Sequence, residues 1–337
     1  MQKKTLPDLR SRATKEFIML KTGVQSAGWF DMNDPTGSFE YIKSCGFEAV
    51  DFNIDHYLKP NVLAKEGISE TFFDRSVEDI LSFFTPLKEA SEKTGVIISQ
   101  MHAPFPCFFR DMPELNEYIV GVLDKCLAAC EYVGCPAIVV HPNAGENKND
   151  ELELNLDLYR TLIPIVKKYH GVKICSENIF IRRGQRMVAG RFADAAEACR
   201  LIDTLNEEAG GDYFGFCLDV GHANLTARNV HDFVVELGDR LTILHIHDNN
   251  GMEDFHMIPY SYLTTSSLHV CDWQGFVDGL AESGYSGTLA FETFRIFSAY
   301  PKAVHTEALR LISAIGHYWA EQIEEKREKM KQQGDNT

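Results

Sequence analysis

Short apolar runs, bounded by turn residues, recur along the whole chain. Most are continuously apolar rather than alternating, a pattern typical of parallel strands that are covered on both faces. Their lengths and their turn-forming neighbours also suit strands. We therefore predict eight strands: Phe17–Thr22, Phe47–Asn53, Val96–His102, Ala137–His141, Val172–Asn178, Phe214–Asp219, Leu241–His247 and Gly287–Thr293.

Between these runs, apolar residues recur at spacings of three and four, which predicts amphipathic helices. The clearest helical patterns cover Ser76–Thr94, Glu114–Val133, Leu152–Tyr169 and Asp194–Leu205. A long helix is predicted after the eighth strand, from Pro301 to about Lys331, and its last turns are densely charged. Such a charged end is typical of a solvated helix.

Eight strands alternating with helices fit either a closed barrel or an open, doubly wound sheet. No Gly-x-Gly-x-x-Gly follows the first strand and the sequence contains no Gly-Lys-Ser/Thr phosphate loop, so we expect no nucleotide cofactor. The strand count favours an α/β fold of one domain, a (β/α)8 TIM barrel with a C-terminal helical extension. We assign 1–16 to an N-terminal segment, 17–320 to the barrel, and 321–337 to a charged helix end and tail.

Composition is that of an ordinary globular protein, with 45% hydrophobic and 24% charged residues among 337. The start of the chain has no apolar stretch of signal-peptide type, and no apolar run is long enough to cross a membrane. The nine cysteines lie mostly inside apolar patterns; Cys126, Cys130 and Cys135 are close enough to suggest zinc, but core packing is the better interpretation. We expect a cytoplasmic protein with reduced thiols and no membrane partner. The net charge of −16 argues mildly against nucleic acid as a partner.

Histidines and carboxylates stand at the ends of six of the predicted strands and in one loop. In a barrel of this type, these ends build the active site. The nine candidate ligands are His102, His141, Glu177, Asp219, His222, His245, Asp254, His256 and Glu292. A mixed nitrogen and oxygen set suits Zn²⁺, Mn²⁺, Co²⁺ or a similar ion.

Each residue also has an ordinary structural interpretation. A histidine at a strand end is often only hydrogen-bonded, Asp219 could cap a turn, and Asp254 could be a solvated loop acid. Glu177 could form a salt bridge with Lys173, Arg182 or Arg183. The recurrence at one end of consecutive strands favours a shared metal site over independent structural roles.

The same residues carry a resemblance to the xylose-isomerase-like TIM-barrel superfamily, which includes sugar isomerases and epimerases and the endonuclease IV type of apurinic-site nuclease. The shared motifs are Met-His-Ala-Pro at 101–104, Leu-Asp-Val-Gly-His at 218–222, His-Ile-His-Asp at 245–248, Asp-Phe-His at 254–256 and Phe-Glu-Thr at 291–293. The resemblance implies one Mn²⁺-like ion held by Glu177, Asp219, His245 and Glu292 in the epimerase branch. In the nuclease branch, it implies three zinc ions on all nine positions, and this chain retains every one.

One departure from the family pattern lies after the Asp-x-His motif. Relatives usually continue into a Pro-Gly-x-Gly turn and then Asp-Trp, whereas this chain inserts the polar stretch Ser261–Ser267 before Asp272. This difference places the rim position of His256 in question and predicts a reshaped substrate entrance.

The leading functional hypothesis is an isomerase or epimerase of a small sugar or sugar phosphate that uses Mn, Co, Mg or Zn. Glu177 and Glu292 are the predicted catalytic acid and base, acting beside a metal-chelated carbonyl. The predicted substrate-binding residues are Asn178, Arg182, Arg183 and His247, with the arginine pair equally well explained as part of a solvated loop. The alternatives are a zinc-dependent nuclease, a dehydratase of sugar-acid or inositol type, and a barrel that binds without converting. A homodimer is a further expectation for a barrel of this size.

Overall fold

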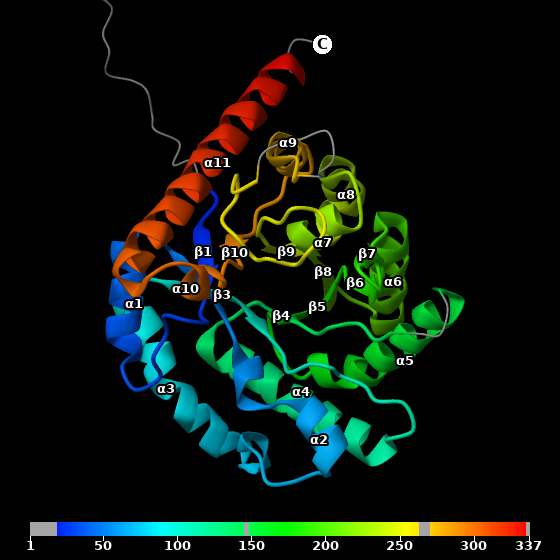
Figure 1. Ribbon diagram of the computed structural model, residues 1–337. Helices are drawn as coiled ribbons and strands as arrows, with labels where there is room; N and C mark the ends of the chain where they lie inside the picture. The colour runs from blue at the N-terminus through cyan, green and yellow to red at the C-terminus, as the bar shows by residue number, and fades with distance from the viewer. Residues whose placement is uncertain (1–18, 145–147, 263–269, 335–337) are drawn as a thin grey trace, which may run out of the picture.

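Eight parallel strands form a barrel at the centre of the molecule (Figure 1). The structure is a computed structural model that describes residues 19–144, 148–262 and 270–334. Around the barrel, the strands follow the order β10 (Leu289–Phe291), β1 (Thr22–Gln25), β2 (Ala49–Phe52), β3 (Ile97–His102), β4 (Ala137–Val139), β5 (Lys173–Glu177), β8 (Phe214–Asp219) and β9 (Leu241–His245). A parallel bridge between Ile246 and Phe291 joins β9 to β10. The predicted (β/α)8 barrel is confirmed.

The first strand begins later than the sequence pattern predicts. The apolar run was predicted as Phe17–Thr22, but β1 starts at Thr22, and the part of the run before Met19 lies outside the described residues. Met19 is 44% exposed, whereas Leu20 is 5% exposed and belongs to the core. β1 pairs through Gly23, opposite Ala49 and Ala290, where a side chain would meet Thr288 at 2.9 Å. Close packing, rather than hydrophobicity, sets the register.

Helices cover the outside of the barrel, between successive strands (Figure 1). The α-helices are α1 (Pro35–Ser44), α2 (Pro60–Glu66), α3 (Val77–Thr94), α4 (Pro113–Val133), α5 (Lys148–Val166), α6 (Ala195–Ala209), α7 (Val220–Leu225), α8 (Val230–Leu237), α9 (Trp273–Glu282), α10 (Ile296–Ala299) and α11 (His305–Gly334). Short 3-10 helices are η1 (Ile54–Tyr57), η2 (Phe72–Asp74), η3 (Gly238–Arg240) and η4 (Lys302–Val304). None of these described helices is both long and apolar enough to cross a membrane.

Local sequence explains where several helices begin and end. The Ser76 side chain accepts a hydrogen bond from the backbone N–H of Asp79 and caps α3, which ends at Gly95 in the left-handed conformation. α5 starts four residues earlier than predicted and ends three residues earlier, at Val166. α11 starts at His305 instead of Pro301, because η4 occupies the intervening turn.

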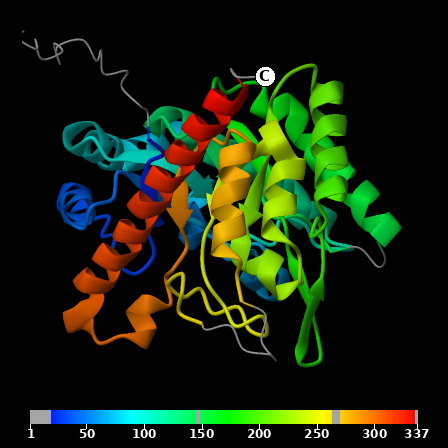
Figure 2. The ribbon, with the colours of Figure 1, turned by 90° about the horizontal axis from the view of Figure 1, so that it is seen from above.

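An antiparallel hairpin follows β5, in the segment that was interpreted either as substrate-binding or as a solvated loop. It consists of β6 (Phe180–Arg183) and β7 (Arg186–Ala189). Gly184 has a positive φ of 62° at its tip, a conformation that glycine adopts without strain. Figure 2 shows this hairpin, the loop after β9 and α10 at the same end of the barrel.

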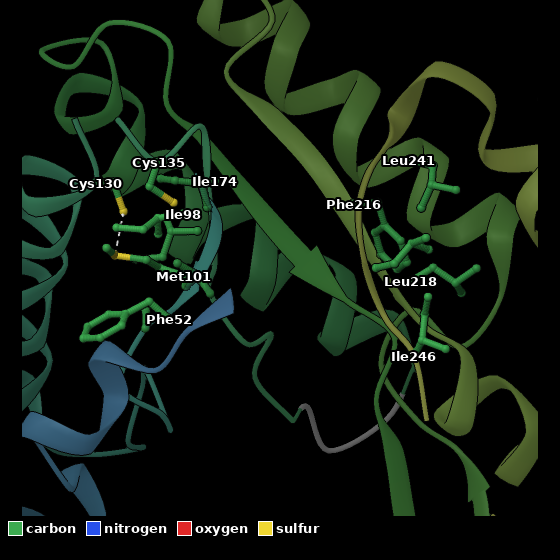
Figure 3. Close-up of a cluster of buried hydrophobic side chains, with 14 of the residues drawn as sticks. Phe52, Ile98, Met101, Cys130, Cys135, Ile174, Phe216, Leu218, Leu241 and Ile246 are labelled. Carbon is green, nitrogen blue, oxygen red and sulfur yellow. Dashed lines mark hydrogen bonds between the residues drawn. The ribbon is translucent and has the colours of Figure 1, made fainter. Parts of the chain in front are cut away.

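The core has two layers. Between the strands and the helices lies the larger one, part of which is shown in Figure 3 with Phe52, Ile98, Met101 and Phe216 labelled. The Sγ atom of Cys130 lies 3.5 Å from Met101 Sδ in this layer, so the packing interpretation of that cysteine holds. All nine cysteines are free. Inside the barrel, a smaller cluster, called here the interior plug, consists of Ala137, Val139, Cys175, Cys217 and Ile243.

Candidate metal and substrate site

The interior plug sets the position of the polar residues above it. Side chains two residues apart on a strand point to the same side. Two residues beyond the plug, four strands therefore carry a polar group over it: His141 after β4, Glu177 on β5, Asp219 on β8 and His245 on β9. Glu177, Asp219 and His245 are almost completely buried. A buried ionised group is costly unless it is paired or binds a cation, so this arrangement calls for partners.

The first group of donors joins β3, β4 and β5. His102 Nε2 lies 3.0 Å from His141 Nε2, which in turn lies 2.8 Å from Glu177 Oε2. The other ring nitrogen of His102 donates to the carbonyl of Ala103 at 2.9 Å. This bond fixes the ring and leaves its Nε2 facing the neighbouring donors.

The second group lies deeper, around His245. Its Nδ1 is 3.2 Å from Glu177 Oε1 and 3.6 Å from Glu292 Oε2. Asp219, His245 and Glu292 offer ligand atoms within 4.8 Å of one another, as do Glu177, Asp219 and His222. The Asp219 carboxylate also accepts a hydrogen bond from the backbone N–H of His222 at 2.7 Å and caps α7, so the capping and cluster interpretations both describe it.

The third group consists of His222, His247, Asp254 and His256. Asp254 Oδ2 lies 3.0 Å from His256 Nε2 and 3.7 Å from His222 Nε2. The His256 backbone has a positive φ of 46°, and Asp248 and Met257, which flank it in the loop, exchange two backbone hydrogen bonds. His256 therefore lies at the rim despite the altered loop. Of Ser261–Ser267, only Ser261 and Tyr262 are among the described residues.

Hydrogen bonds to backbone carbonyls orient the rim histidines. His222 Nδ1 donates to Asn178 O at 2.8 Å, and His256 Nδ1 donates to Glu292 O at 2.9 Å. His102 has the same arrangement, as described above. In metal sites, a ligating histidine characteristically donates its other N–H in this way, which fixes the tautomer and points a lone pair at the ion.

The structure thus brings together all nine predicted donors. Two of the predicted substrate-binding residues, Asn178 and His247, are buried beside Asp219 and do not line the cavity described below. The Asn178 amide exchanges hydrogen bonds with the Asp219 backbone, at 2.8 Å in both directions. His247 has its Nε2 3.1 Å from Asp219 Oδ1, and its ring stacks on His256 with centroids 3.8 Å apart.

The predicted arginine pair lies on the hairpin. Arg182 forms a two-pronged ion pair with Glu253, with distances of 2.7 and 3.2 Å, and Arg183 is exposed. Neither arginine lines the cavity described below. The salt-bridge interpretation of Glu177 does not hold, because Lys173 pairs with Asp212 and imidazoles surround Glu177.

Electrostatics follow from this packing of acids against imidazoles. Burial alone would raise the pKa of Glu177, but His141 and His245 hold that pKa well below its usual range. Burial opposes charge on His222 as well, yet Asp219 and Asp254 raise its pKa to about 10. Glu292 and Asp254 likewise raise the pKa of His256 to about 9, against the effect of burial. Glu177 is therefore ionised, and His222 and His256 are protonated, whereas burial lowers the pKa of His141.

Sequence reasoning missed Asp51, which lies at the end of β2. Its Oδ2 is 3.2 Å from His245 Nε2 and accepts a hydrogen bond from Gln100 Nε2 at 3.0 Å. Asp51 is buried inside an apolar run, Ala-Val-Asp-Phe. A charged residue within such a run is itself a signal, since it needs a buried partner.

A cavity of about 410 Å³ opens over the cluster. Seven of the nine predicted donors line it. Three phenylalanines lie beside their rings: Phe105 against His141, Phe180 against His222 and Phe294 against His256, with centroids 4.4, 4.9 and 4.4 Å apart. On the side of β1 and β2, the lining residues are Gln25, Ala27, Asn53, Asp55 and His56.

These residues fit a divalent cation. The donor set combines carboxylates with imidazoles, and the rim rings are held by carbonyls in the manner of metal ligands. His247 Nδ1 and Asp254 Oδ1 are buried and have no hydrogen-bond partner among the described residues. The set is too rich in nitrogen for a calcium cage, and the one thiol within reach, Cys217, does not make a soft site.

Comparison with known proteins agrees with the fold. The family described as "Xylose isomerase-like TIM barrel" matches the chain over residues 39–315. A protein of Sinorhizobium fredii, y4fM, is 27% identical and the match covers 84% of this chain and 90% of that protein. A protein of Methanocaldococcus jannaschii, MJ1311, is 26% identical with coverage of 93% and 96%.

Solved structures show the same fold at low identity. The 3-keto-D-glucoside 4-epimerase YcjR of E. coli has a TM-score of 0.61 at 17% identity, covering 88% of this chain and 99% of that one. An L-ribulose 3-epimerase has a TM-score of 0.65 at 15% identity, covering 93% and 98%. The IolI protein, solved with a zinc atom, has a TM-score of 0.56 at 19% identity, covering 92% and 99%.

Proposed function

Because the chain belongs to the xylose isomerase-like TIM barrel family, we propose that it is a divalent-metal-dependent isomerase or epimerase of a small polyhydroxylated carbonyl compound. The observation that carries this proposal is the pair of glutamates, Glu177 and Glu292, which line one cavity and both face Nδ1 of His245. Two carboxylates facing one substrate can remove a proton and return it elsewhere. The epimerases named above share the fold and act on sugars, which supports the same substrate class here.

The metal ligands in this proposal are Glu177, Asp219, His245 and Glu292. A bound Mn, Co, Mg or Zn ion would polarise the substrate carbonyl and so acidify the neighbouring C–H bond. Asn178 holds the backbone of Asp219 in place, and Asp51 orients the His245 ring from behind. These contacts give the donors a fixed geometry, which an orienting site requires.

Proton transfer is assigned to the two glutamates. Glu177 is ionised at neutral pH, because His141 and His245 lower its pKa, and it can therefore act as a base. Glu292 lies at the end of β10 on the cavity wall, with Phe294 two residues further along. The three phenylalanines beside the rim histidines make the surroundings apolar, which strengthens the charge interactions with the reacting atoms.

Metal content and proton exchange test this proposal together. Purified protein is expected to hold one ion per chain and to incorporate deuterium from D2O into a ketose such as L-ribulose at the exchanged carbon. A Glu292→Gln variant should lose about 10²–10⁴-fold in kcat, the usual contribution of a general acid or base. The matched control is Glu208→Gln, since Glu208 pairs with Arg160 on the outer surface. Full activity in Glu292→Gln, or no metal in protein never exposed to chelator, refutes the assignment.

A zinc-dependent nuclease is the second candidate, because the nine donors fall into several overlapping groups and could hold more than one ion. Against it stands the net charge of −16, which repels a phosphate backbone. About three zinc ions per chain, together with cleavage of abasic DNA, would favour this candidate. Loss of water from the ketose in the deuterium-exchange assay would indicate a dehydratase.

A further inference from the structure

One sector of the cavity wall contributes none of the nine donors. The donors come from β3, β4, β5, β8, β9, β10 and the loops that follow them. The remaining sector, called here the β1–β2 wall, consists of Gln25, Asn53, Asp55 and His56, all of which line the same cavity. A substrate bound to the cluster at one end would therefore present its other end to this wall.

Gln25 is held in the wall by hydrogen bonds, and its side-chain NH2 group remains available as a donor. It ends β1 and is only 2% exposed. Its Oε1 accepts from the backbone N–H of Ala27 at 2.5 Å, and Trp29 Nε1 donates to its carbonyl at 2.6 Å. No described residue accepts a hydrogen bond from its Nε2 group, which belongs to the cavity lining. Gln25 lines the cavity, so a ligand oxygen there can accept a hydrogen bond from this amide.

Asn53 and Asp55 are fixed in place before any ligand binds. Ser26 Oγ donates to Asn53 Oδ1 at 3.1 Å and accepts from the Asn53 backbone N–H at 2.9 Å. Asn53 Nδ2 donates to Asp55 Oδ1 at 3.2 Å. The second carboxylate oxygen of Asp55 is left as an acceptor at the cavity wall. Such held side chains lose little entropy when they bind a ligand.

Charge decides which ligand group fits here. A carboxylate accepts hydrogen bonds from hydroxyls but repels a phosphate. Among the described residues that line the cavity, none is a lysine or an arginine, and Arg182 is paired with Glu253 elsewhere. The protonated imidazoles of His222 and His256 belong to the donor cluster, where Asp254 pairs with both, and not to the β1–β2 wall. Phe294 and Phe105, on the two sides of this wall, offer apolar faces to C–H groups. Hydroxyls beside C–H groups, without a phosphate, describe an unmodified sugar.

We propose that the β1–β2 wall binds the hydroxyl groups of an unphosphorylated sugar, with Gln25 donating to one hydroxyl oxygen and Asp55 accepting from another. This inference rests on the proposed isomerase or epimerase function and specifies its substrate class. The sequence leaves open whether the substrate is a sugar or a sugar phosphate, and this inference selects the sugar.

Matched pairs of substrates test the inference. Metal-loaded protein is assayed with D-fructose and D-fructose 6-phosphate, and with L-ribulose and L-ribulose 5-phosphate. The free sugar of the better pair should be preferred by about 100-fold or more in kcat/KM, the range expected when a site leaves a charge unpaired. A preference for the phosphate ester overturns the inference alone. Conversion of neither class overturns the proposed function and the inference with it.

Variants of the wall give the second readout. Asp55→Ala and Gln25→Met should raise KM for the free sugar at least 10-fold with unchanged metal content, and Asp55→Lys should shift the preference toward the phosphate ester. Asp212→Asn is the matched control, because Asp212 pairs with Lys173, at the start of β5 and away from the cavity. Unchanged KM in both Asp55→Ala and Gln25→Met would show that the wall does not touch the substrate.

Discussion

Both ring nitrogens of His245 face carboxylates, which come from different strands. One points to the carboxylates of Glu177 and Glu292, while the other lies 3.2 Å from Asp51. Gln100 holds that aspartate from the far side. A carboxylate behind a ligating imidazole raises its basicity and fixes its orientation. Asp51 thereby acts on the cluster without belonging to it.

Replacing Asp51 by asparagine should weaken metal binding by about 10–100-fold, the usual effect of losing such an outer partner. The measurement is a competition titration of the metal-free protein against a chromophoric chelator, with the Co²⁺ absorption spectrum as a second readout. Asp272→Asn, at the N-cap of α9, is the control and should leave the affinity unchanged. An unaltered affinity in a correctly folded Asp51→Asn variant would remove Asp51 from the site.

The protonated rim histidines give the metal-free protein a distinctive pH dependence. Acidic neighbours raise the pKa values of His222 and His256 to about 10 and about 9 from an unfolded value of about 6.5. A raised pKa stabilises the fold fully below the unfolded value, and this stability is lost as pH rises through the folded value. The free energy of unfolding should therefore fall between about pH 6.5 and 10.

Urea unfolding of chelator-treated protein across this range measures the effect. Metal-loaded protein should not show the same decline, because an ion held by Asp219 and Glu292 neutralises carboxylates that raise these two pKa values. Its binding should therefore release protons into an unbuffered solution. His222→Gln should flatten the slope of the metal-free protein. A stability that rises with pH over this range would contradict the charge assignment.

At the scale of single elements, β1 depends on a residue with no side chain. A Cβ on Gly23 would lie 2.9 Å from Thr288 Cγ2 and 3.1 Å from Ala49 Cβ. Gly23→Ala should destabilise the barrel by about 1–3 kcal/mol through overpacking. Adding Thr288→Ser, which removes Cγ2, should recover part of the loss in chemical denaturation. No recovery would place the strain on the Ala49 side.

The first strand also shows what an apolar pattern can and cannot reveal. The eight strands and their polar ends could be predicted because buried parallel strands are continuously apolar. β1 was placed too early, because Phe17–Leu20 is more hydrophobic than the glycine-containing segment that pairs. Gln25, at the end of the true strand, was consequently missed. Glycine packing is a property of neighbours that are distant in sequence, so a local pattern does not contain it.

The hairpin and Asp51 were missed for other reasons. β6 and β7 are short, and their Arg-Arg-Gly-Gln-Arg turn has the composition of a solvated loop. The nine donors could be predicted because residues at the carboxyl ends of the strands all lie on the same face of a barrel. Asp51 lies behind this cluster, and only the closed barrel brings it against His245.

At the scale of the whole molecule, α11 packs against the first and the last strand of the barrel. It packs on α9, β1 and β10 (Figure 1). Trp319 is 1% exposed and stacks with Trp273 and Phe291 at centroid distances of 5.1 and 5.7 Å. The boundary at 320 predicted from the sequence falls within this helix, which continues without a break to Gly334.

Trp319→Ala should cost about 3–5 kcal/mol in the free energy of unfolding, the usual range for a fully buried aromatic side chain. Its neighbour Tyr318 is 54% exposed, so Tyr318→Ala is a matched control that should change stability little. Urea denaturation followed by circular dichroism compares the two. Equal losses would mean that α11 packs less tightly than its contacts indicate.

The spread of the donors along the chain has a consequence for folding. They run from His102 on β3 to Glu292 beyond β10, so a chain with strands still undocked presents no complete set. An ion held by the full set would bind the closed barrel and not its partly assembled forms, adding about 2.7 kcal/mol at a free concentration a hundred times the Kd. The cluster would then stabilise the closed barrel as well as carry out the reaction. The concentration of free metal would determine what fraction of the protein stays folded.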